Sequence, residues 1–567
     1  MSEAVKQPRK IRGKVCSFAM HLPVRRHGQR DLHLIKERVV FDDGTDEPVL
    51  KWREDYKRSF YITKKAKRNH QSKKEREALN NVDEFTCTQS DLPVSIARAL
   101  GERNSFGGLR QVCQSPYVYG ADIKSTALIK HEYMTKYPGV NTRMNVAVCD
   151  IETKVTSEIS KKQIILCSIT CKSIVHIAVV KSFINGIFDF WEKINNVLDK
   201  HLGPYSAQRN INYRIHEVDS PAEAVISCIN VAHKIMPDFL TFWNMDFDIP
   251  VMVKALEAEG HDPANIFSDP SVPRDRRFFE YRQGKKKKIT ASGKETPIKP
   301  SAQWHTVLTP ASFYIIDSMC VYRIIRTGKA EEPSYSLNAI LGKLLKLTKL
   351  EIEETRHLKG LKWHIEMQTN YRLEYIAYNA FDCISVEMAD EKTNDLSLVI
   401  QQFSDCSDFS DFSSQPRRVV DQLHFYCLND GYVIGSTGSS MREVEDAFTD
   451  SLDGWIITLA APLNVDNGLC VITELPRHRT NARAHTGDLD VGASYPTNQY
   501  CLNVSKETTI REICRSELMQ PVMRKITLNL SGGRTNAMQI CQLAYNFPSH
   551  EELSQLFDRE NCLEMTV

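Results

Sequence analysis

The sequence predicts a soluble protein with a mixed α/β fold, and three features of the 567 residues lead to that prediction. Apolar residues make up 42% and charged residues 25% of the chain, which is ordinary for a soluble protein of several domains. Runs rich in Ile and Val alternate with helical patterns between residues 144 and 395. No run of about eighteen apolar residues occurs, and the N-terminus is polar and basic, so we expect neither a membrane span nor a secretory signal.

The α/β region follows from its individual elements. The expected strands are rich in Ile and Val, one expected helix stops at Gly260, and the last expected helix is long. The expected strands are 144–153, 163–171, 174–180, 238–244 and 313–319, and the expected helices are 221–236, 248–260 and 371–394.

The segments outside these elements are less regular. Residues 1–140 mix short strand-like runs with loops, and 404–416 is a connector rich in Ser and Asp. Basic and aromatic residues interleave at 51–76, and 274–303 is basic and interrupted by Gly and Pro, which is typical of an exposed hairpin or loop. Each of these two segments fits a nucleic-acid contact and a solvated surface about equally well.

Charge and cysteine content narrow the class of protein. The net charge is +2, but residues 1–80 hold 21 Lys and Arg against 11 Asp and Glu, which leaves −8 on the rest. This asymmetry predicts an anionic partner near the N-terminal region. The 16 cysteines include no C-x-x-C pair, so we expect reduced structural thiols in a cytoplasmic protein.

Carboxylates that are close in sequence could share a cation. Asp150 and Glu152 are two apart on an expected strand, so both point to one face and repel each other unless a cation neutralises them. Taken alone, D-x-E is too common a pattern to indicate a metal site, and the simpler interpretation is a strand end with solvated acids. Asp248 lies where a strand meets a helix, and by itself it would be a helix cap.

Tyr378 and Asp382 are four apart on an expected helix, so they share a face of it. A phenol beside a carboxylate can hold a water molecule that a metal on the carboxylate activates. An isolated pair with this spacing is most often an ordinary surface pair.

The order of these patterns carries more weight than any one of them. D-x-E, then N-x-x-F-D, then Y-x-x-x-D resembles the three exonuclease motifs of family B DNA polymerases, and YSLNAIL and YIAYNAFDCISVEMAD resemble the versions in T-even-type phages. The resemblance implies an RNase H-like 3′→5′ exonuclease domain at 144–395, in which Tyr378 orients the attacking water. The implied ligands of two Mg²⁺ (or Mn²⁺) ions are Asp150, Glu152, Asp248 and Asp382, and Asn244 and Phe247 of the second motif are expected to contact DNA. The lysines of the basic segment, Lys285, Lys286, Lys287 and Lys288, are further expected DNA contacts because of their charge.

A second resemblance lies at 488–497, where DLDVGASYPT is similar to polymerase motif A, D-x-x-S-L-Y-P-S. It implies that Asp490 binds metal in the palm and that Tyr495 packs under the deoxyribose of the incoming nucleotide. Ser494 stands where Leu is usual, so the motif does not determine how the site would distinguish deoxyribonucleotides from ribonucleotides. Two other interpretations of this segment stay open. GDLD could be the G-D-x-D of motif C, although the Tyr-Pro pair that follows Asp490 favours motif A, and Asp490 could be an ordinary turn residue.

The other polymerase motifs are missing. The nearest match to motif B, Asn104–Gly108, comes too early and has Leu100 in place of Lys; no D-T-D occurs, and only 77 residues of the 567 follow Asp490. We therefore expect the N-terminal subunit of a split polymerase similar to those of large tailed phages, located in the host cytoplasm. The expected domains are an N-terminal α+β domain at 1–143, the exonuclease at 144–395, a return segment at 396–432 and a partial palm at 433–567.

The expected partners follow from the same resemblance. They are the single-stranded 3′ end of DNA, the primer-template, a dNTP bound jointly with a second chain, and that chain itself, which would carry motifs B and C. A sliding clamp is a further partner of such enzymes, although the sequence has no recognisable clamp-binding peptide. The alternatives are a stand-alone 3′→5′ exonuclease with a degenerate polymerase remnant, and a non-catalytic DNA-binding or scaffolding protein that keeps the fold.

Overall fold

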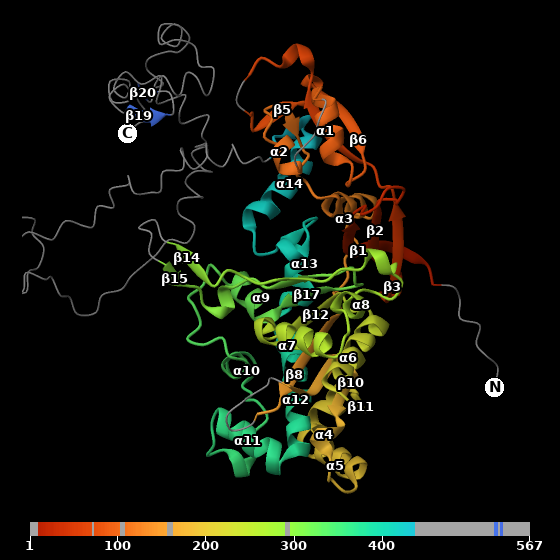
Figure 1. Ribbon diagram of the computed structural model, residues 1–567, viewed down its shortest axis with the longest axis vertical. Helices are drawn as coiled ribbons and strands as arrows, with labels where there is room; N and C mark the ends of the chain where they lie inside the picture. The colour runs from red at the N-terminus through yellow and green to blue at the C-terminus, as the bar shows by residue number, and fades with distance from the viewer. Residues whose placement is uncertain are drawn as a thin grey trace, which may run out of the picture. The chain divides into compact units, whose positions relative to one another are not determined.

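The computed structural model describes residues 9–70, 73–102, 108–155, 163–289 and 295–436, and two short strands near the C-terminus (Figure 1). The chain divides into two compact units, Met1–Asp450 and Ser451–Val567. In the second unit, β19 (Thr527–Leu530) pairs antiparallel with β20 (Gly533–Asn536). The first unit contains helices and a large mixed sheet, so the predicted α/β class is confirmed.

An eight-stranded sheet forms the centre of the first unit, in the order β11-β10-β9-β8-β12-β17-β16-β13. β9 runs antiparallel to its neighbours β8 and β10, whereas β12 is parallel to β8 and β17, and β11 is parallel to β10. The strands are β8 (Val146–Thr153), β9 (Ile164–Cys171), β10 (Ile174–Val180), β11 (Asn212–Val218), β12 (Phe239–Phe242), β13 (Glu280–Arg282), β16 (Thr306–Leu308) and β17 (Tyr314–Asp317).

Helices cover both faces of this sheet, and strand alternation decides which side chains each face receives. Ala147, Cys149 and Ile151 of β8 pack in one core with α6 (Pro221–Ile235) and α7 (Met245–Ala258). Val146 and Val148 pack in another core, with α12 (Arg372–Thr393). The even-numbered residues of β8 therefore face α12.

Local sequence explains where the covering helices begin. Ser220 caps α6 by accepting a hydrogen bond from the Glu223 amide, and Pro221 occupies the first turn. The other helices in the described part of the first unit are α1 (Leu92–Leu100), α2 (Leu109–Val112), α3 (Ser125–Lys136), α4 (Lys181–Ile184), α5 (Phe190–Arg209), α8 (Pro263–Phe267), α9 (Ser318–Ile325), α10 (Leu337–Leu345), α11 (Leu361–Asn370), α13 (Ile400–Ser404) and α14 (Gln415–Asn429).

The N-terminal region has two small antiparallel sheets of its own. One contains β1 (Ile11–Leu22), β2 (Leu32–Phe41) and β3 (Asp46–Glu54), and the other contains β6 (Val82–Cys87), β4 (Arg58–Thr63) and β7 (Val118–Tyr119). The chain comes back to this region after α14, because β18 (Tyr432–Ile434) pairs with β5 (Arg76–Ala78).

The segment at 404–416 differs from the connector that its composition predicts. Cys406, Phe409 and Phe412 are buried, and the Phe409 ring lies 5.1 Å from the Tyr314 ring and 5.2 Å from the Phe239 ring. Ser and Asp are abundant here because they form turns around these anchors: Asp408 accepts from the Ser410 amide at 2.9 Å.

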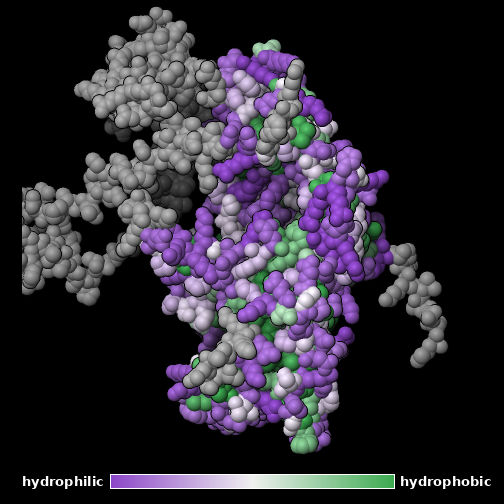
Figure 2. Space-filling view, in the orientation of Figure 1, coloured by the Kyte–Doolittle hydropathy of each residue, from purple (hydrophilic) through white to green (hydrophobic). Residues whose placement is uncertain are grey.

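The basic segment at 274–303 contains the expected exposed hairpin, formed by β14 (Lys287–Ile289) and β15 (Glu295–Pro297). In Figure 1 the hairpin lies at the left edge of the coloured ribbon, and the coloured surface at this edge in Figure 2 is hydrophilic. The cysteines in the described part of the chain are buried and free. Among the described residues, no helix has both the length and the apolar character that a membrane span needs.

Candidate active site

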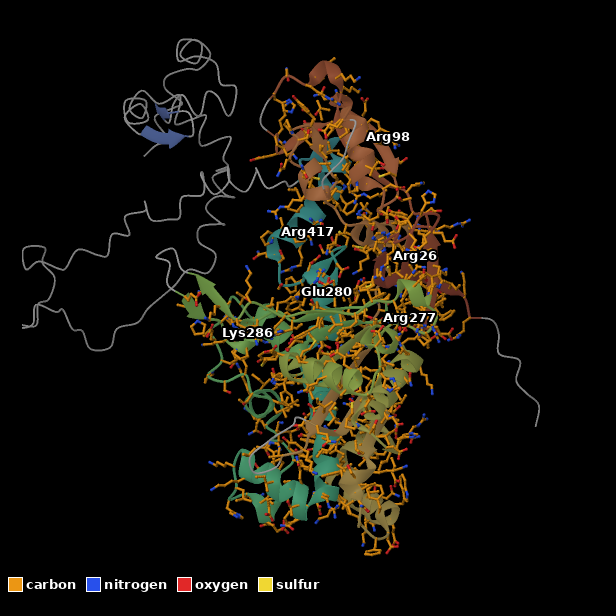
Figure 3. The ribbon with its side chains drawn as sticks, in the orientation of Figure 1. Arg26, Arg98, Arg277, Glu280, Lys286 and Arg417 are labelled. Atoms are coloured by element: carbon orange, nitrogen blue, oxygen red, sulfur yellow. The ribbon has the colours of Figure 1, made fainter. Side chains whose placement is uncertain are left out.

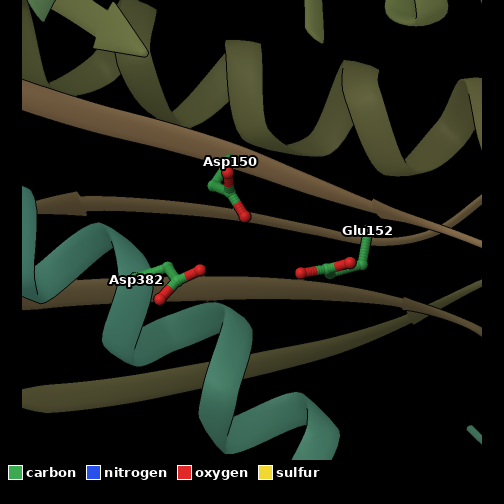
Figure 4. A group of neighbouring side chains, drawn as sticks. All are labelled: Asp150, Glu152 and Asp382. Carbon is green, nitrogen blue, oxygen red and sulfur yellow. The ribbon is translucent and has the colours of Figure 1, made fainter. Parts of the chain in front are cut away.

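Three carboxylates from two elements converge on one point. Asp150 and Glu152 lie on the α12 side of β8, and Asp382 lies on α12. One oxygen from each carboxylate lies within 4.8 Å of the other two. Figure 4 shows the three side chains pointing into a common space. Carboxylate oxygens at this spacing are the donor set that Mg²⁺ or Mn²⁺ prefers.

Asp248 and Tyr378 line the same cavity, whose volume is about 450 Å³. Asp248 is buried in the first turn of α7 but does not cap that helix, because Asn244 holds the N-cap position. Asp248 is not one of the three acids grouped within 4.8 Å. The four acids of the three motifs thus share a cavity, with three of them in the tighter group.

Burial governs the ionisation of these acids. It is the main cause that raises the pKa of Asp150 well above its usual range, and the charge of Asp248 adds to it. Burial likewise raises the pKa of Glu152 to about 7. The pKa of Asp248 and that of Asp382 are also raised, again chiefly by burial. The cavity therefore favours either protons or a cation.

Lys349 supplies a positive charge that the sequence did not reveal. Its Nζ lies 2.5 Å from Asp382 Oδ2 and donates to Tyr378 Oη at 2.9 Å. Burial opposes the charged ammonium, but Asp382 and the neighbouring acids outweigh it and raise the pKa of Lys349. The other oxygen, Asp382 Oδ1, is buried and accepts no hydrogen bond within the described residues.

Two further side chains of α12 hold the acids of β8. Tyr375 Oη donates to Glu152 Oε2 at 2.5 Å, and Asn379 Nδ2 donates to Asp150 Oδ2 at 2.7 Å. Both residues were missed at the sequence level. They are three residues before Tyr378 and Asp382, respectively, so helical spacing from the motif could have found them.

The residues predicted to contact DNA differ in whether they line a cavity. Asn244 and Phe247 line the acidic cavity and also a second, larger cavity of about 880 Å³. Lys286 lines only the larger cavity. The other lysines of the run, Lys285, Lys287 and Lys288, are exposed on the hairpin segment and line neither of these two cavities. Asp490 and Tyr495 lie outside the described residues, as does most of Asn104–Gly108.

Comparison of the sequence with protein-family models and with curated proteins finds no match.

Proposed function

We propose that this chain is a divalent-metal-dependent 3′→5′ DNA exonuclease of the family B polymerase type, and the N-terminal part of a split DNA polymerase. One observation carries the exonuclease proposal. Four acids that are separated by up to 232 residues in the chain, from Asp150 to Asp382, line a single cavity together with Tyr378. Unrelated surface acids would have no reason to meet in this way.

The sheet supports an RNase H-like fold for this domain. β9 is the one strand between β11 and β17 that runs against its neighbours, and the central strand β8 carries the first two acids. The last acid lies on a long helix packed over β8, so the fold itself brings the first and third motifs together.

The residues fit a pair of divalent cations. The donors are hard oxygens, and one of them, Asp382 Oδ1, is buried without a hydrogen-bond partner among the described residues. Of the described residues that line this cavity, Lys349 is the one lysine or arginine, against four carboxyl groups. Mg²⁺ or Mn²⁺ ions held by Asp150, Glu152, Asp248 and Asp382 would act as Lewis acids on the scissile phosphate and would lower the pKa of the attacking water.

The side chains around the acids have separate tasks in this reaction. Tyr378 Oη, held by Lys349, would orient the water for in-line attack on phosphorus. Lys349, which lines the same cavity, would also stabilise the negative charge that develops on the phosphate. Tyr375 and Asn379 keep Glu152 and Asp150 in position, so their effect on the reaction is indirect.

Replacement of two acids tests the nuclease proposal. In Asp150→Ala with Glu152→Ala, Mg²⁺-dependent shortening of 5′-labelled single-stranded DNA from its 3′ end should disappear. A matched control is Glu217→Ala with Asp219→Ala, which removes two exposed acids with the same spacing at the end of β11. Equal nuclease activity in wild type and in the β8 double variant would disprove the assignment.

The polymerase part of the proposal rests on the motif A resemblance at Asp490 and Tyr495. A primer-template reaction needs at least two palm carboxylates, and this sequence offers one. The purified chain alone should therefore not extend a primer, and a second chain bearing motifs B and C should restore extension. Processive synthesis by the chain alone would refute the split, whereas nuclease activity without any such partner in the source cells would favour a stand-alone exonuclease.

A further inference from the structure

Asp246 holds together two segments that are far apart in the sequence. It lies in the first turn of α7, two residues before Asp248. Its Oδ1 accepts hydrogen bonds from Tyr281 Oη at 3.1 Å and from Gln283 Nε2, and its Oδ2 lies 3.3 Å from Lys286 Nζ. All three donors belong to the stretch 281–286, which leads from β13 into the basic hairpin.

The other side of this stretch is held by the chain before β16. The Gly284 amide donates to His305 Nδ1 at 3.2 Å. A Cβ atom at Gly284 would lie 2.6 Å from the Trp304 backbone nitrogen, so no larger residue fits without a shift of the backbone. The base of the hairpin is thus held between α7 and residues 303–305, beyond the point where β13 pairs with β16 and Tyr281 packs against the core.

These contacts form one wall of the larger cavity. Asp246, Gln283 and Lys286 line that cavity, while Asn244 and Phe247 of the same helix start line both cavities. Figure 3 labels Lys286, which lies close to the hairpin. The start of α7 therefore lies where the two cavities adjoin, and through Asp246 it holds Gln283 and Lys286 in the wall of the larger one.

We infer that Asp246 is a positioning residue that holds the base of the basic hairpin against α7, and thereby fixes the larger cavity through which a polynucleotide strand reaches the acids. The inference rests on the proposed exonuclease function. A two-stranded hairpin is marginal by itself, so β14 and β15 need this anchor to keep a defined place. Asp246 is engaged by three donors and, unlike Asp248, does not line the acidic cavity.

Hydrogen exchange tests the anchor without reference to catalysis. In Asp246→Ala, backbone amides of 280–289 should exchange faster than in wild type, while those of β8 and α12 should be unchanged. Asp246→Asn should lie between the two, because the amide oxygen can still accept from Tyr281 but has no charge for Lys286. Unchanged exchange at 280–289 in Asp246→Ala would overturn the inference.

Kinetic measurements on a short and a long substrate test whether the anchored hairpin affects how a strand reaches the acids. The p-nitrophenyl ester of thymidine 5′-phosphate needs only the acidic cavity, whereas a single-stranded oligonucleotide also crosses the larger one. For Asp246→Ala we expect kcat/KM on the oligonucleotide to fall about tenfold, mainly through KM, and activity on the ester to stay within about twofold. Equal losses on both substrates would overturn the inference, because Asp246 would then act at the acids.

Glu295→Gln is the matched control. It removes a lysine–carboxylate pair inside the hairpin, with Lys287 at 2.8 Å, but leaves the base of the hairpin attached to α7. It should preserve both the exchange pattern at 280–289 and the oligonucleotide kinetics. Should wild type cleave neither substrate, the proposed function fails, and the exchange experiment alone then decides whether Asp246 anchors the hairpin.

Discussion

Lys349 Nζ lies 2.5 Å from Asp382 Oδ2, which places an ammonium group among the acids of the candidate site. About a third of the Lys349 side chain is exposed, whereas Asp382 is nearly fully buried. The lysine therefore reaches in from the cavity side and partly neutralises a cluster whose members otherwise repel each other.

Replacing Lys349 by Met should destabilise the protein more without metal than with it. The acids would lose their internal counter-charge, at a cost of about 1–3 kcal/mol in the free energy of unfolding at neutral pH. Mg²⁺ would restore part of this cost. Denaturant titrations in EDTA and in Mg²⁺ measure both values, with Lys346→Met, at the end of α10, as the control. An equal loss under the two conditions would show that Lys349 contributes through packing alone.

Mg²⁺ should stabilise the protein more near pH 8 than near pH 5.5. Burial raises the folded-state pKa of Glu152 to about 7, above the unfolded value of about 4.3. Such a group stabilises the metal-free fold fully below its unfolded pKa, and the contribution is lost as the pH rises through about 7. Asp150, Asp248 and Asp382 shift in the same direction.

Thermal unfolding with Mg²⁺ and with EDTA at the two pH values gives the comparison. The gain in Tm on adding Mg²⁺ should be larger at the higher pH, because the cation binds deprotonated carboxylates and protons compete for them. Asp150→Asn with Glu152→Gln should remove most of this gain at both pH values. A gain that does not depend on pH in the wild type would contradict the shifted ionisation of these acids.

Periodicity explains why much of the site could be predicted. The strand period of two places Asp150 and Glu152 on one face, and the helical spacing of four places Tyr378 and Asp382 on one face. These relations are local, so the sequence contains them. The meeting of β8 with α12 is not local, and only the resemblance between motifs linked the two pairs before the structure did.

Lys349 lacked any such signal. It lies after α10 in a stretch without regular structure, among several other lysines, and its pairing with Asp382 depends on how α10 and α12 pack. The segment at 404–416 is the opposite case, since its Ser and Asp content suggested a connector while Phe409 and Phe412 fix it in the core. The prediction from composition followed the nine polar residues of this segment, whereas its position in the fold is set by the two phenylalanines.

Asp238 should be essential for joining the N-terminal sheet of β1, β2 and β3 to the eight-stranded central sheet. Its carboxylate lies 2.7 Å from Lys36 Nζ and 2.8 Å from Arg38 Nη1 of β2, and all three side chains are buried. Asp238→Ala would leave two buried cations without this partner, at a cost of about 3–5 kcal/mol in unfolding free energy.

The control for Asp238 is Asp219→Ala, which removes a surface pair with Lys181 and should cost less than about 0.5 kcal/mol. Urea titrations of the two variants measure the difference. Similar small losses in both would mean that the buried pairs contribute no more than exposed ones, and that apolar packing alone joins the two sheets.

Removal of the hairpin lysines should weaken DNA binding through charge rather than shape. We expect Lys285→Ala, Lys287→Ala and Lys288→Ala together to raise the Kd for single-stranded DNA and to lower the slope of log K against log salt by up to about 2, since each phosphate contact contributes about 0.7. Lys286 is left in place because it anchors the hairpin to Asp246.

Fluorescence anisotropy with a labelled oligonucleotide at several salt concentrations measures both quantities. The control replaces three exposed lysines of α4 and α5, Lys181, Lys193 and Lys200, and so changes the net charge equally. If both triple variants lose the same affinity and slope, the field of the whole protein drives binding. A loss confined to the hairpin variant would locate phosphate contacts beside the larger cavity, where a strand on its way to Asp150 and Asp382 would pass.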